Sequence, residues 1–369
     1  MEKEEIIKKF LERGRLLTPK AVEFLLEKDI NDFLDDNYTT LVLDESSILI
    51  KDKIKIIKNL IEKKKEITTE DFISFYKSKY EKMKNIITNR IQKDFISLNK
   101  LNLKRNEVYV IGIVKDIKQK EEKKIIELED MTTTVSAIFD AQEVEGLDLD
   151  DVVAVKAISA GNIIYGKKIL YPDIPLRPPI KGHGKICFIS DLHLDEAPLE
   201  NLTTFLSWFE KENIKYLFVA GDIGNDEIFE KLINTYCYNK KVFVIPGNID
   251  SEEYPQIPKH YTSKYIISLS NPSIVEINGV KILIIHKMNI DMLKKRYLGR
   301  ANIILSEDYL PLEDVPDIVH FGHTHEPQIL NYKSVTLVNS GSLLTQFKPV
   351  LIDLSTRETV YIDIDKIKK

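Results

Sequence analysis

Five apolar runs of strand length in this chain each end in side chains that can bind a metal ion. An Asp and a His two residues apart leave a strand end on the same side. One such pair alone is a weak signal, because many strands end in a polar turn, but five runs in series are far more specific. The runs and their end residues are ICFISDLHLD with Asp191 and His193, YLFVAGDIGN with Asp222, VFVIPGNID with Asn248, KILIIH with His286, and DIVHFGHTH with His323 and His325.

Length, cysteine content and charge set limits on the class of protein. The 369 residues allow two or three domains with apolar cores. Cys187 and Cys237 are the only cysteines, so we expect buried thiols and a reducing cytoplasm. The opening MEKEEIIKKF is not an apolar signal segment, and no run approaches the roughly 18 apolar residues of a membrane span, so we expect a cytoplasmic protein without a membrane partner. The net charge of -5 argues against indiscriminate coating of nucleic acid and leaves the partner open.

Residues 1–100 are expected to form a helical N-terminal region. The stretch EEIIKKFLERGRLLTPKAVEFLLEK predicts a helical hairpin with Thr18 and Pro19 at the second helix start. TTLVLDESSILI can add a short strand, and KDKIKIIKNLIEKKKE is expected to return to helix. The last helix, EDFISFYKSKYEKMKNIITNRI, is capped by Thr68 or Thr69, and its apolar stripe, which includes Phe72 and Tyr76, is expected to be core.

The period of the apolar residues changes to two over residues 101–175. Five short strands separated by charged or glycine-bearing turns predict a five-stranded OB-type β-barrel. The aromatic residues Tyr109, Phe139 and Tyr165 are too few to decide whether it binds nucleic acid or protein. Residues 176–184, rich in Pro and Gly, predict a linker, and residues 185–369 alternate strands with helices before a final series of strands. The fold class is therefore multidomain α+β: a helical region, a barrel, and an α/β sandwich with a second sheet formed by the final strands.

The side chains at the five strand ends predict a centre for two divalent cations. They are two aspartates, four histidines and one asparagine, with no thiolate, which suits Mn²⁺ first, and also Mg²⁺, Fe²⁺ or Zn²⁺. Two ions about 3.5–4 Å apart, bridged by a carboxylate, stabilise the in-line displacement of a phosphoester. The sequence therefore predicts phosphoester hydrolysis. His260 and His320 are instead expected to be satisfied core residues.

The motif order D-x-H, G-D, G-N-x-D, H and G-H-x-H resembles the calcineurin-like metallophosphoesterases from about Lys185 onward. The resemblance implies Asp191, His193, Asp222 and His325 around one ion. Around the other it implies Asp222, Asn248, His286 and His323, so that Asp222 is the bridge. It also points to Asp222, Asn248 and Asp250 as catalytic residues.

A second resemblance covers most of the chain: the small subunit of archaeal family D DNA polymerase. It rests on the order of helical region, barrel and phosphoesterase, and on motifs such as LLTPKAVEFLL, DFISFYKSKYEKMKNII, YPDIP, IDMLKKRYL and VNSGSLLTQF. The resemblance implies a metal-dependent 3′ to 5′ exonuclease that proofreads DNA with a 3′ end. It further implies a heterodimer with a large catalytic polymerase subunit.

The sequence departs from the phosphoesterase pattern at three positions. Ile249 stands where nucleases of the superfamily have a histidine that protonates the leaving group or steadies the transition state, so we expect weakened exonuclease activity. Asn225 stands where an acid is common, and Lys287 where glycine is usual. Two alternatives remain open: a non-catalytic assembly subunit of the polymerase, and a stand-alone phosphodiesterase for small or cyclic nucleotides.

Overall fold

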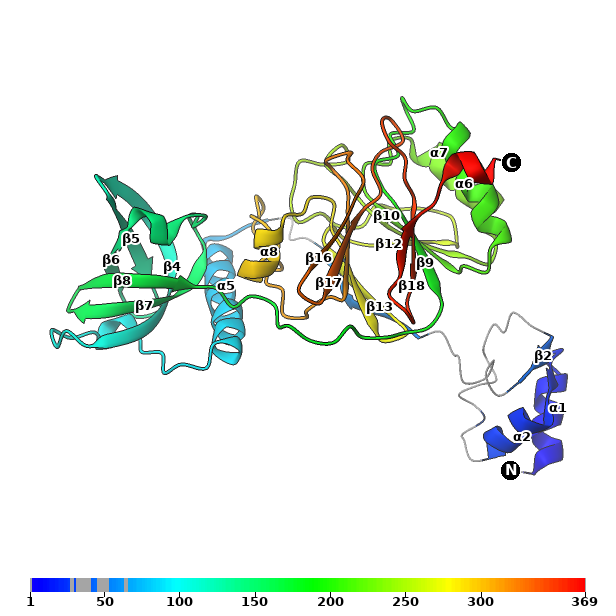
Figure 1. Cartoon of the computed structure of the whole chain (residues 1–369), viewed down its shortest axis with the longest axis horizontal. Coiled ribbons are helices and arrows are strands. Elements are labelled where there is room, and N and C mark those ends of the chain that lie inside the picture. The colour runs from blue at the N-terminus through cyan, green and yellow to red at the C-terminus, as the bar shows by residue number, and fades with distance from the viewer. Residues whose placement is uncertain (1, 27–29, 31–40, 45–52, 63–65, 369) are drawn as a thin grey trace. The chain divides into compact units, whose positions relative to one another are not determined.

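The computed structural model describes residues 2–26, 30, 41–44, 53–62 and 66–368 (Figure 1). Residues 1–55 with 276–279 form one compact unit, and residues 56–275 with 280–369 form the other. The fold class predicted from the sequence is confirmed: a helical N-terminal part, a closed five-stranded barrel and a mixed α/β domain are all present. The boundaries predicted at residues 100, 175 and 184 stay predictions. Among the described residues, none of the helices has both the length and the apolar character to span a membrane.

The first unit holds the predicted helical hairpin. Its elements are α1 (Lys3–Leu11), β1 (Leu16–Leu17), α2 (Pro19–Leu26) and β2 (Val42–Leu43). The Thr18 hydroxyl accepts a hydrogen bond from the Ala21 N–H at 3.3 Å, as expected of a residue that caps a helix. Ile6, Phe10 and Leu25 are buried together and make the small core of this unit. Most of the short strand expected over residues 39–50 lies outside the described residues.

One expectation for the N-terminal region is wrong. The stretch expected to return to helix instead contains the strand β3 (Ile54–Lys58), at the edge of a six-stranded sheet beside β13 (Ser273–Ile277). Its β-branched isoleucines suit a pleated surface, and Ile57 packs against the core of that sheet. Pairing with a distant strand therefore overrides the local helical pattern.

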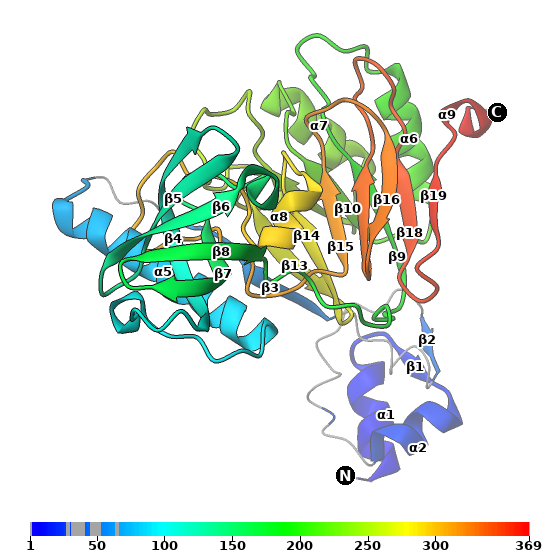
Figure 2. The same cartoon turned by 60° about the vertical axis from the view of Figure 1, so that its left-hand side comes forward.

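The long helix α5 (Thr69–Arg90) begins at Thr68, whose hydroxyl accepts from the Asp71 N–H while the Asp71 carboxylate accepts from the Thr68 N–H. The C-terminal half of α5 buries Tyr80, Met83 and Ile87 against the barrel strands β4 (Glu107–Lys120) and β7 (Val152–Ala160). Figure 2 shows α5 beside these two strands. The aromatic stripe is not core along its whole length, because Phe72 is 48% exposed and Tyr76 is 37% exposed.

The barrel has the five predicted strands. Their order around the closed ring is β4-β5-β6-β8-β7, and all neighbours are antiparallel except β6 and β8. Alternate residues of each strand point inward, so Leu128, Phe139 and Val155 are buried at its centre. The strands are β4 (Glu107–Lys120), β5 (Lys123–Glu129), β6 (Thr134–Asp140), β7 (Val152–Ala160) and β8 (Ile163–Leu170), with short 3₁₀ turns at Leu98–Lys100 and Ala141–Val144.

Two six-stranded sheets form the sandwich. Their strand orders are β12-β11-β10-β9-β18-β19 and β16-β17-β15-β14-β13-β3. The predicted second sheet exists, but the final strands do not make it alone: β17 joins the second sheet, whereas β18 and β19 extend the first. The strands are β9 (Lys185–Ile189), β10 (Tyr216–Ala220), β11 (Lys241–Ile245), β12 (Ile266–Ser268), β14 (Val280–Ile284), β15 (Ile318–Phe321), β16 (Gln328–Tyr332), β17 (Val335–Asn339), β18 (Val350–Asp353) and β19 (Thr359–Tyr361).

The two sheets pack face to face, with helices on their outer sides. The ring of Phe188 on β9 lies 4.7 Å, centroid to centroid, from the ring of His320 on β15. Apolar faces of α6 (Glu200–Lys211), α7 (Asp226–Tyr236) and α9 (Ile364–Ile367) cover the first sheet, as Figure 1 shows. α8 (Ile290–Lys295) covers the second sheet through Leu293. Both cysteines are buried free thiols, as expected.

Candidate metal centre

All five predicted strands are present, and each is followed by its predicted polar residues. In the first sheet β9, β10 and β11 run parallel, and in the second sheet β14 and β15 run parallel. The carboxyl ends of parallel strands meet at one edge of a sheet, where open α/β folds place their sites. The loops after these strands carry the seven side chains to that edge.

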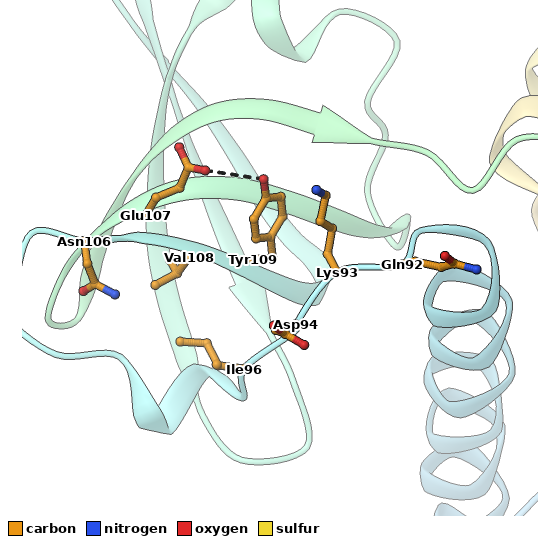
Figure 3. A pocket seen from close by; sticks show the side chains of 8 residues that line it. All are labelled: Gln92, Lys93, Asp94, Ile96, Asn106, Glu107, Val108 and Tyr109. Carbon is orange, nitrogen blue, oxygen red and sulfur yellow. Dashed lines mark hydrogen bonds between the residues drawn. The ribbon is translucent and has the colours of Figure 1, made fainter.

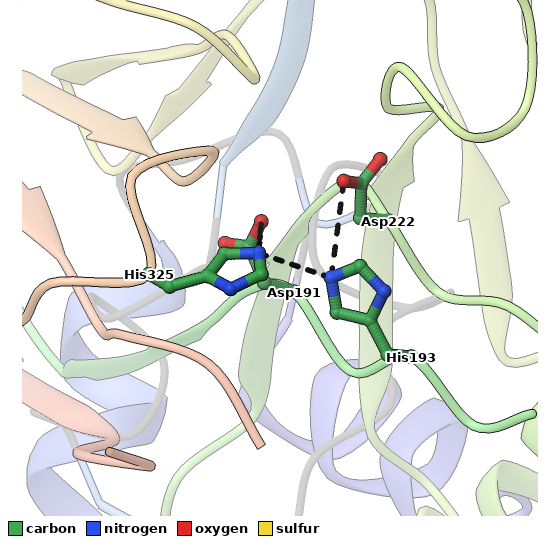
Figure 4. Close-up of side chains that lie close together, drawn as sticks. All are labelled: Asp191, His193, Asp222 and His325. Atoms are coloured by element: carbon green, nitrogen blue, oxygen red, sulfur yellow. Dashed lines mark hydrogen bonds and ion pairs between the residues drawn. The ribbon is translucent and has the colours of Figure 1, made fainter. Parts of the chain in front are cut away.

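Four of these side chains form one compact group. Their ligand atoms, from Asp191, His193, Asp222 and His325, all lie within 4.8 Å of one another (Figure 4). The two imidazole Nε2 atoms are 3.1 Å apart, His325 Nε2 is 3.6 Å from Asp191 Oδ1, and His193 Nε2 is 3.9 Å from Asp222 Oδ2. This group is the set that the phosphoesterase resemblance assigned to the first ion.

The other three side chains gather around one amide oxygen. Asn248 Oδ1 lies 2.8 Å from His286 Nε2 and 2.8 Å from His323 Nδ1. His286 Nε2 is also 3.3 Å from Asp222 Oδ2. Asp222 therefore lies between both groups, at the position expected of a bridging carboxylate. The structure brings all seven predicted residues together, and their role as ligands stays a prediction.

The backbone of five of these residues is left-handed. The φ angles are 52° at Asp191, 45° at His193, 50° at Asp222, 71° at His323 and 59° at His325. A residue other than glycine in this region costs on the order of 1–3 kcal/mol, and such residues cluster at functional sites. The surrounding fold holds the strained backbone and so fixes the direction of each side chain.

Two motif glycines let neighbouring loops approach the carboxylates. A Cβ atom on Gly247 would lie 2.1 Å from Asp222 Oδ1, and one on Gly322 would lie 2.2 Å from Asp191 Oδ2. These distances are far shorter than any non-bonded contact. The glycines of G-N and G-H-x-H are therefore required for packing against the two aspartates.

Buried hydrogen bonds through two side-chain amides, which the sequence does not predict, connect two of the loops. The Asn271 Oδ1 atom accepts from the His286 N–H at 3.1 Å, and Asn271 Nδ2 donates to Gln256 Oε1 at 2.7 Å. Gln256 Nε2 in turn donates to the Gly247 carbonyl at 2.8 Å. Neither residue belongs to a recognisable motif, so the sequence carries no signal for this support.

The predicted catalytic residue Asp250 is not part of either group. Its two carboxylate oxygens accept from the Gly247 N–H and from Lys259 Nζ, each at 2.7 Å. These contacts hold the loop that carries Asn248. The neighbouring Ile249 donates its N–H to Asp222 Oδ1 at 3.1 Å, while its side chain is 48% exposed.

Three further residues singled out in the sequence lie outside the two groups: Asn225, His320 and His260. Asn225 caps α7 by accepting from the Ile228 N–H at 3.0 Å. His320 is buried with Nε2 at 2.9 Å from the Ile189 carbonyl, as predicted. The prediction for His260 is wrong, because it lies exposed on the surface loop before β12 rather than in the core.

Comparisons with known proteins agree with this architecture. The calcineurin-like phosphoesterase superfamily domain matches residues 185–357, which include all seven residues of the candidate centre. The DNA polymerase II small subunit of Methanothermobacter thermautotrophicus is 30% identical over 352 residues, covering 75% of this chain and 73% of that protein. This chain belongs to the family of archaeal DNA polymerase II small subunits.

Other members of the archaeal small-subunit family match at similar levels. The Archaeoglobus fulgidus small subunit is 28% identical and covers 79% of this chain and 74% of its own length. The Thermoplasma acidophilum small subunit is 26% identical and covers 99% of this chain and 94% of its own length. Both resemblances predicted from the sequence are thus confirmed: this small subunit carries a calcineurin-like phosphoesterase domain.

The pKa values of the Asp and His side chains at the candidate centre depend on burial and on one another. Burial would lower the pKa of His286, but the hydrogen bond to Asp222 and the charges of Asp222 and Asp191 outweigh it and raise that pKa. Burial would likewise raise the pKa of Asp222, but contacts with His286 and the Ile249 N–H lower it. Burial raises the pKa of Asp191 and lowers the pKa of His323. The carboxylates thus draw positive charge into this site.

The donor atoms fit divalent cations. His286 Nδ1 lies 2.8 Å from the Ala220 carbonyl, so this nitrogen carries a proton, and Nε2, which faces the oxygens of Asn248 and Asp222, either carries a second proton or presents its lone pair to a cation. A lone pair that faces oxygens is favourable only with a cation or a proton between them. The same holds for the facing Nε2 atoms of His193 and His325, since two lone pairs repel. Imidazole, carboxylate and amide donors suit Mn²⁺, Fe²⁺, Zn²⁺ and Mg²⁺.

A cavity of about 810 Å³ lies away from this centre, on the barrel (Figure 3). Tyr109 and Glu107 are hydrogen-bonded within it at 3.4 Å, and Glu107 also pairs with Lys156 and Lys167. Of the barrel aromatics named from the sequence, Phe139 is buried, Tyr109 is half-buried and Tyr165 is 48% exposed. No His or Cys is among the residues that line this cavity, so it does not offer the donor set found at the strand ends.

Proposed function

We propose that this small subunit is a metal-dependent phosphodiesterase that removes 3′ nucleotides from single-stranded or mismatched DNA ends. The observation that supports this function best is the convergence of seven donor side chains around the shared carboxylate of Asp222. A proofreading nuclease needs such a site beside the growing DNA end. The large catalytic polymerase subunit is the proposed partner.

The residues divide into two ligand sets that share one member. Asp191, His193, Asp222 and His325 would hold one cation, and Asp222, Asn248, His286 and His323 would hold the other. Two divalent cations, Mn²⁺ in the first place, supply Lewis-acid charge at the phosphoryl and leaving oxygens of an in-line displacement. The protein keeps His286 in one tautomer through the Ala220 carbonyl and holds the Asn248 loop through the Asp250 contacts with Gly247 and Lys259.

Ile249 limits what the protein itself can add to the reaction. An aliphatic side chain neither gives a proton to the leaving group nor hydrogen-bonds to the transition state. We therefore expect turnover slower than in a site with histidine at this position. Catalysis would then depend mainly on the bound cations and their ligands, without a proton donor from position 249.

The test uses the purified full chain and a single-stranded oligonucleotide labelled at its 5′ end. We expect shortening from the 3′ end that depends on Mn²⁺ and is lost in Asp222→Ala. A matched control is Asp365→Asn, which removes an exposed carboxylate on α9 outside the centre and should keep wild-type activity. Full activity in Asp222→Ala would exclude the proposed site.

The exposed Ile249 also favours a second candidate, a non-catalytic assembly subunit. For that function, Asp222→Ala and His323→Ala should bind and activate the large subunit as well as the wild type does, and no Mn²⁺-dependent nuclease should appear with or without that subunit. A stand-alone phosphodiesterase would instead hydrolyse cyclic nucleotides and show no affinity for any polymerase chain.

A further inference from the structure

Two exposed aliphatic side chains border the candidate metal centre, one beside each ligand set. Ile249 is 48% exposed and Leu344 is 39% exposed. Single exposed aliphatic residues are common on protein surfaces. These two are unusual because of their positions relative to the ligands.

Ile249 is fixed beside the second ligand set. It directly follows Asn248, and its N–H donates to Asp222 Oδ1 at 3.1 Å. Its backbone is therefore within hydrogen-bonding distance of the carboxylate shared by both sets, while the side chain remains accessible to solvent.

Leu344 is fixed beside the first ligand set by both of its neighbours. The Leu343 N–H donates to the Asp191 carbonyl at 3.0 Å, and the Thr345 hydroxyl donates to the His325 carbonyl at 3.2 Å. The Ser342 hydroxyl adds a bond of 2.9 Å to the Asp191 carbonyl. Leu344 thus lies on a short turn that joins the backbones of two proposed ligands.

We infer that Ile249 and Leu344 bind the nucleobase and sugar of an unpaired 3′ nucleotide while the polar centre takes its phosphodiester. This inference rests on the proposed function and names the part of the substrate that gives specificity. Aliphatic side chains cannot hydrogen-bond to phosphate, but they contact the faces of bases and the apolar edge of the sugar. A base reaches them only when it is unstacked and unpaired, which costs least at single-stranded or mismatched ends.

The test measures binding and turnover separately, with two tetranucleotides that differ only at the 3′ residue. One ends in thymidine and the other in an abasic residue, so that sugar and phosphate are kept while the base is removed. Binding of each to the full chain is followed by fluorescence anisotropy with Ca²⁺ in place of Mn²⁺. Turnover is then measured with Mn²⁺.

For the wild type we expect the thymidine end to bind roughly fivefold more tightly than the abasic end, since contact of one base with aliphatic groups at the rim is modest. Ile249→Ala and Leu344→Ala should each reduce this ratio, and the double variant should bring it to about one without changing affinity for the abasic end. The control Leu103→Ala removes an 82% exposed leucine that precedes the barrel and should keep the ratio.

The inference is overturned if the ratio is about one in the wild type, or if the variants weaken both oligonucleotides equally. The outcomes also separate this inference from the proposed function. If the thymidine end binds more tightly than the abasic end but no Mn²⁺-dependent turnover occurs, the nuclease function is rejected and the base-binding site is retained. If turnover occurs but both ends bind equally, the nuclease function is retained and the base-binding site is rejected.

Discussion

The Nε2 atoms of His193 and His325 face each other at a distance of 3.1 Å. Two neutral rings in this arrangement either form one N–H···N hydrogen bond or repel through their lone pairs, and a divalent cation can take the place of the shared proton. The folded protein should therefore bind cations that the unfolded chain cannot hold in the same geometry, and binding should stabilise the fold.

We expect Mn²⁺ to raise the unfolding temperature by roughly 5 °C at a hundredfold excess over its dissociation constant. Differential scanning fluorimetry with and without a chelator measures this shift. His325→Ala should lose most of the shift. His260→Ala, at an exposed histidine outside the centre, should keep it. An equal shift in both variants would mean that the cation binds elsewhere.

Gly247→Ala should damage the centre more than its size suggests. The added Cβ would lie 2.1 Å from Asp222 Oδ1, so either the carboxylate or the Asn248 loop must move. We expect a loss of about 2 kcal/mol or more in the free energy of unfolding, together with weaker Mn²⁺ binding. Gly184→Ala is the control for backbone strain alone, because its φ is 85° and no atom lies within 4 Å of the new Cβ. It should cost about 1 kcal/mol and leave Mn²⁺ binding unchanged.

Ile249→His should increase the rate of 3′ nucleotide removal. A histidine here places an acid and hydrogen-bond donor next to the shared carboxylate, and general acid catalysis contributes about 10²–10⁴-fold in favourable sites. We expect a gain of at least about tenfold in the rate constant measured under single-turnover conditions. Ile249→Val keeps an aliphatic residue and should show no gain. A histidine variant no faster than the valine variant would show that a proton donor is not what the site lacks.

His320 predicts how stability depends on pH. Burial lowers the pKa of His320 to about 4, whereas an unfolded histidine titrates near about 6.5. Below pH 6.5 the unfolded chain binds a proton that the folded chain does not, so stability that is complete above pH 6.5 is lost as the pH falls toward 4. The loss at pH 5 should be about 2 kcal/mol by urea denaturation. His320→Gln should lose correspondingly less between pH 7.5 and pH 5, and His260→Gln should behave as the wild type. An NMR titration of the His320 ring near pH 6.5 would contradict the prediction.

The sequence predicts that the seven side chains of the candidate centre meet at one sheet edge, because these residues follow buried strands. A strand buried on both faces gives a continuous apolar run, so the positions of Asp222 and His286 at strand ends are visible without coordinates. Parallel strands then bring such ends together. By contrast, Gln256 and Asn271 support the proposed ligands through side-chain contacts that only the folded loops create, so the spacing of residues in the sequence does not predict them.

The wrong predictions have one physical cause: the pattern of apolar residues along a segment does not show which other segments pack against it. The sequence of Ile54–Lys58 is compatible with either a helix or a strand, and it forms a strand because it pairs with β13 at the edge of the sheet. The periodicity around Phe72 identifies α5 correctly but does not reveal that nothing in the described chain covers that residue fully. His260 has a core-compatible side chain in a loop that lies at the surface.

Closure of the barrel over residues 107–170 has a consequence for assembly. Each of its strands has two hydrogen-bonded neighbours, so another chain cannot lengthen this sheet by adding a strand. The sandwich is different, because β12, β19, β16 and β3 each border one of its sheets. Among the described strands, a partner that docks by adding a strand can pair only with one of these four or with the two-stranded β1-β2 sheet, whereas a partner that docks on the barrel must contact its side chains.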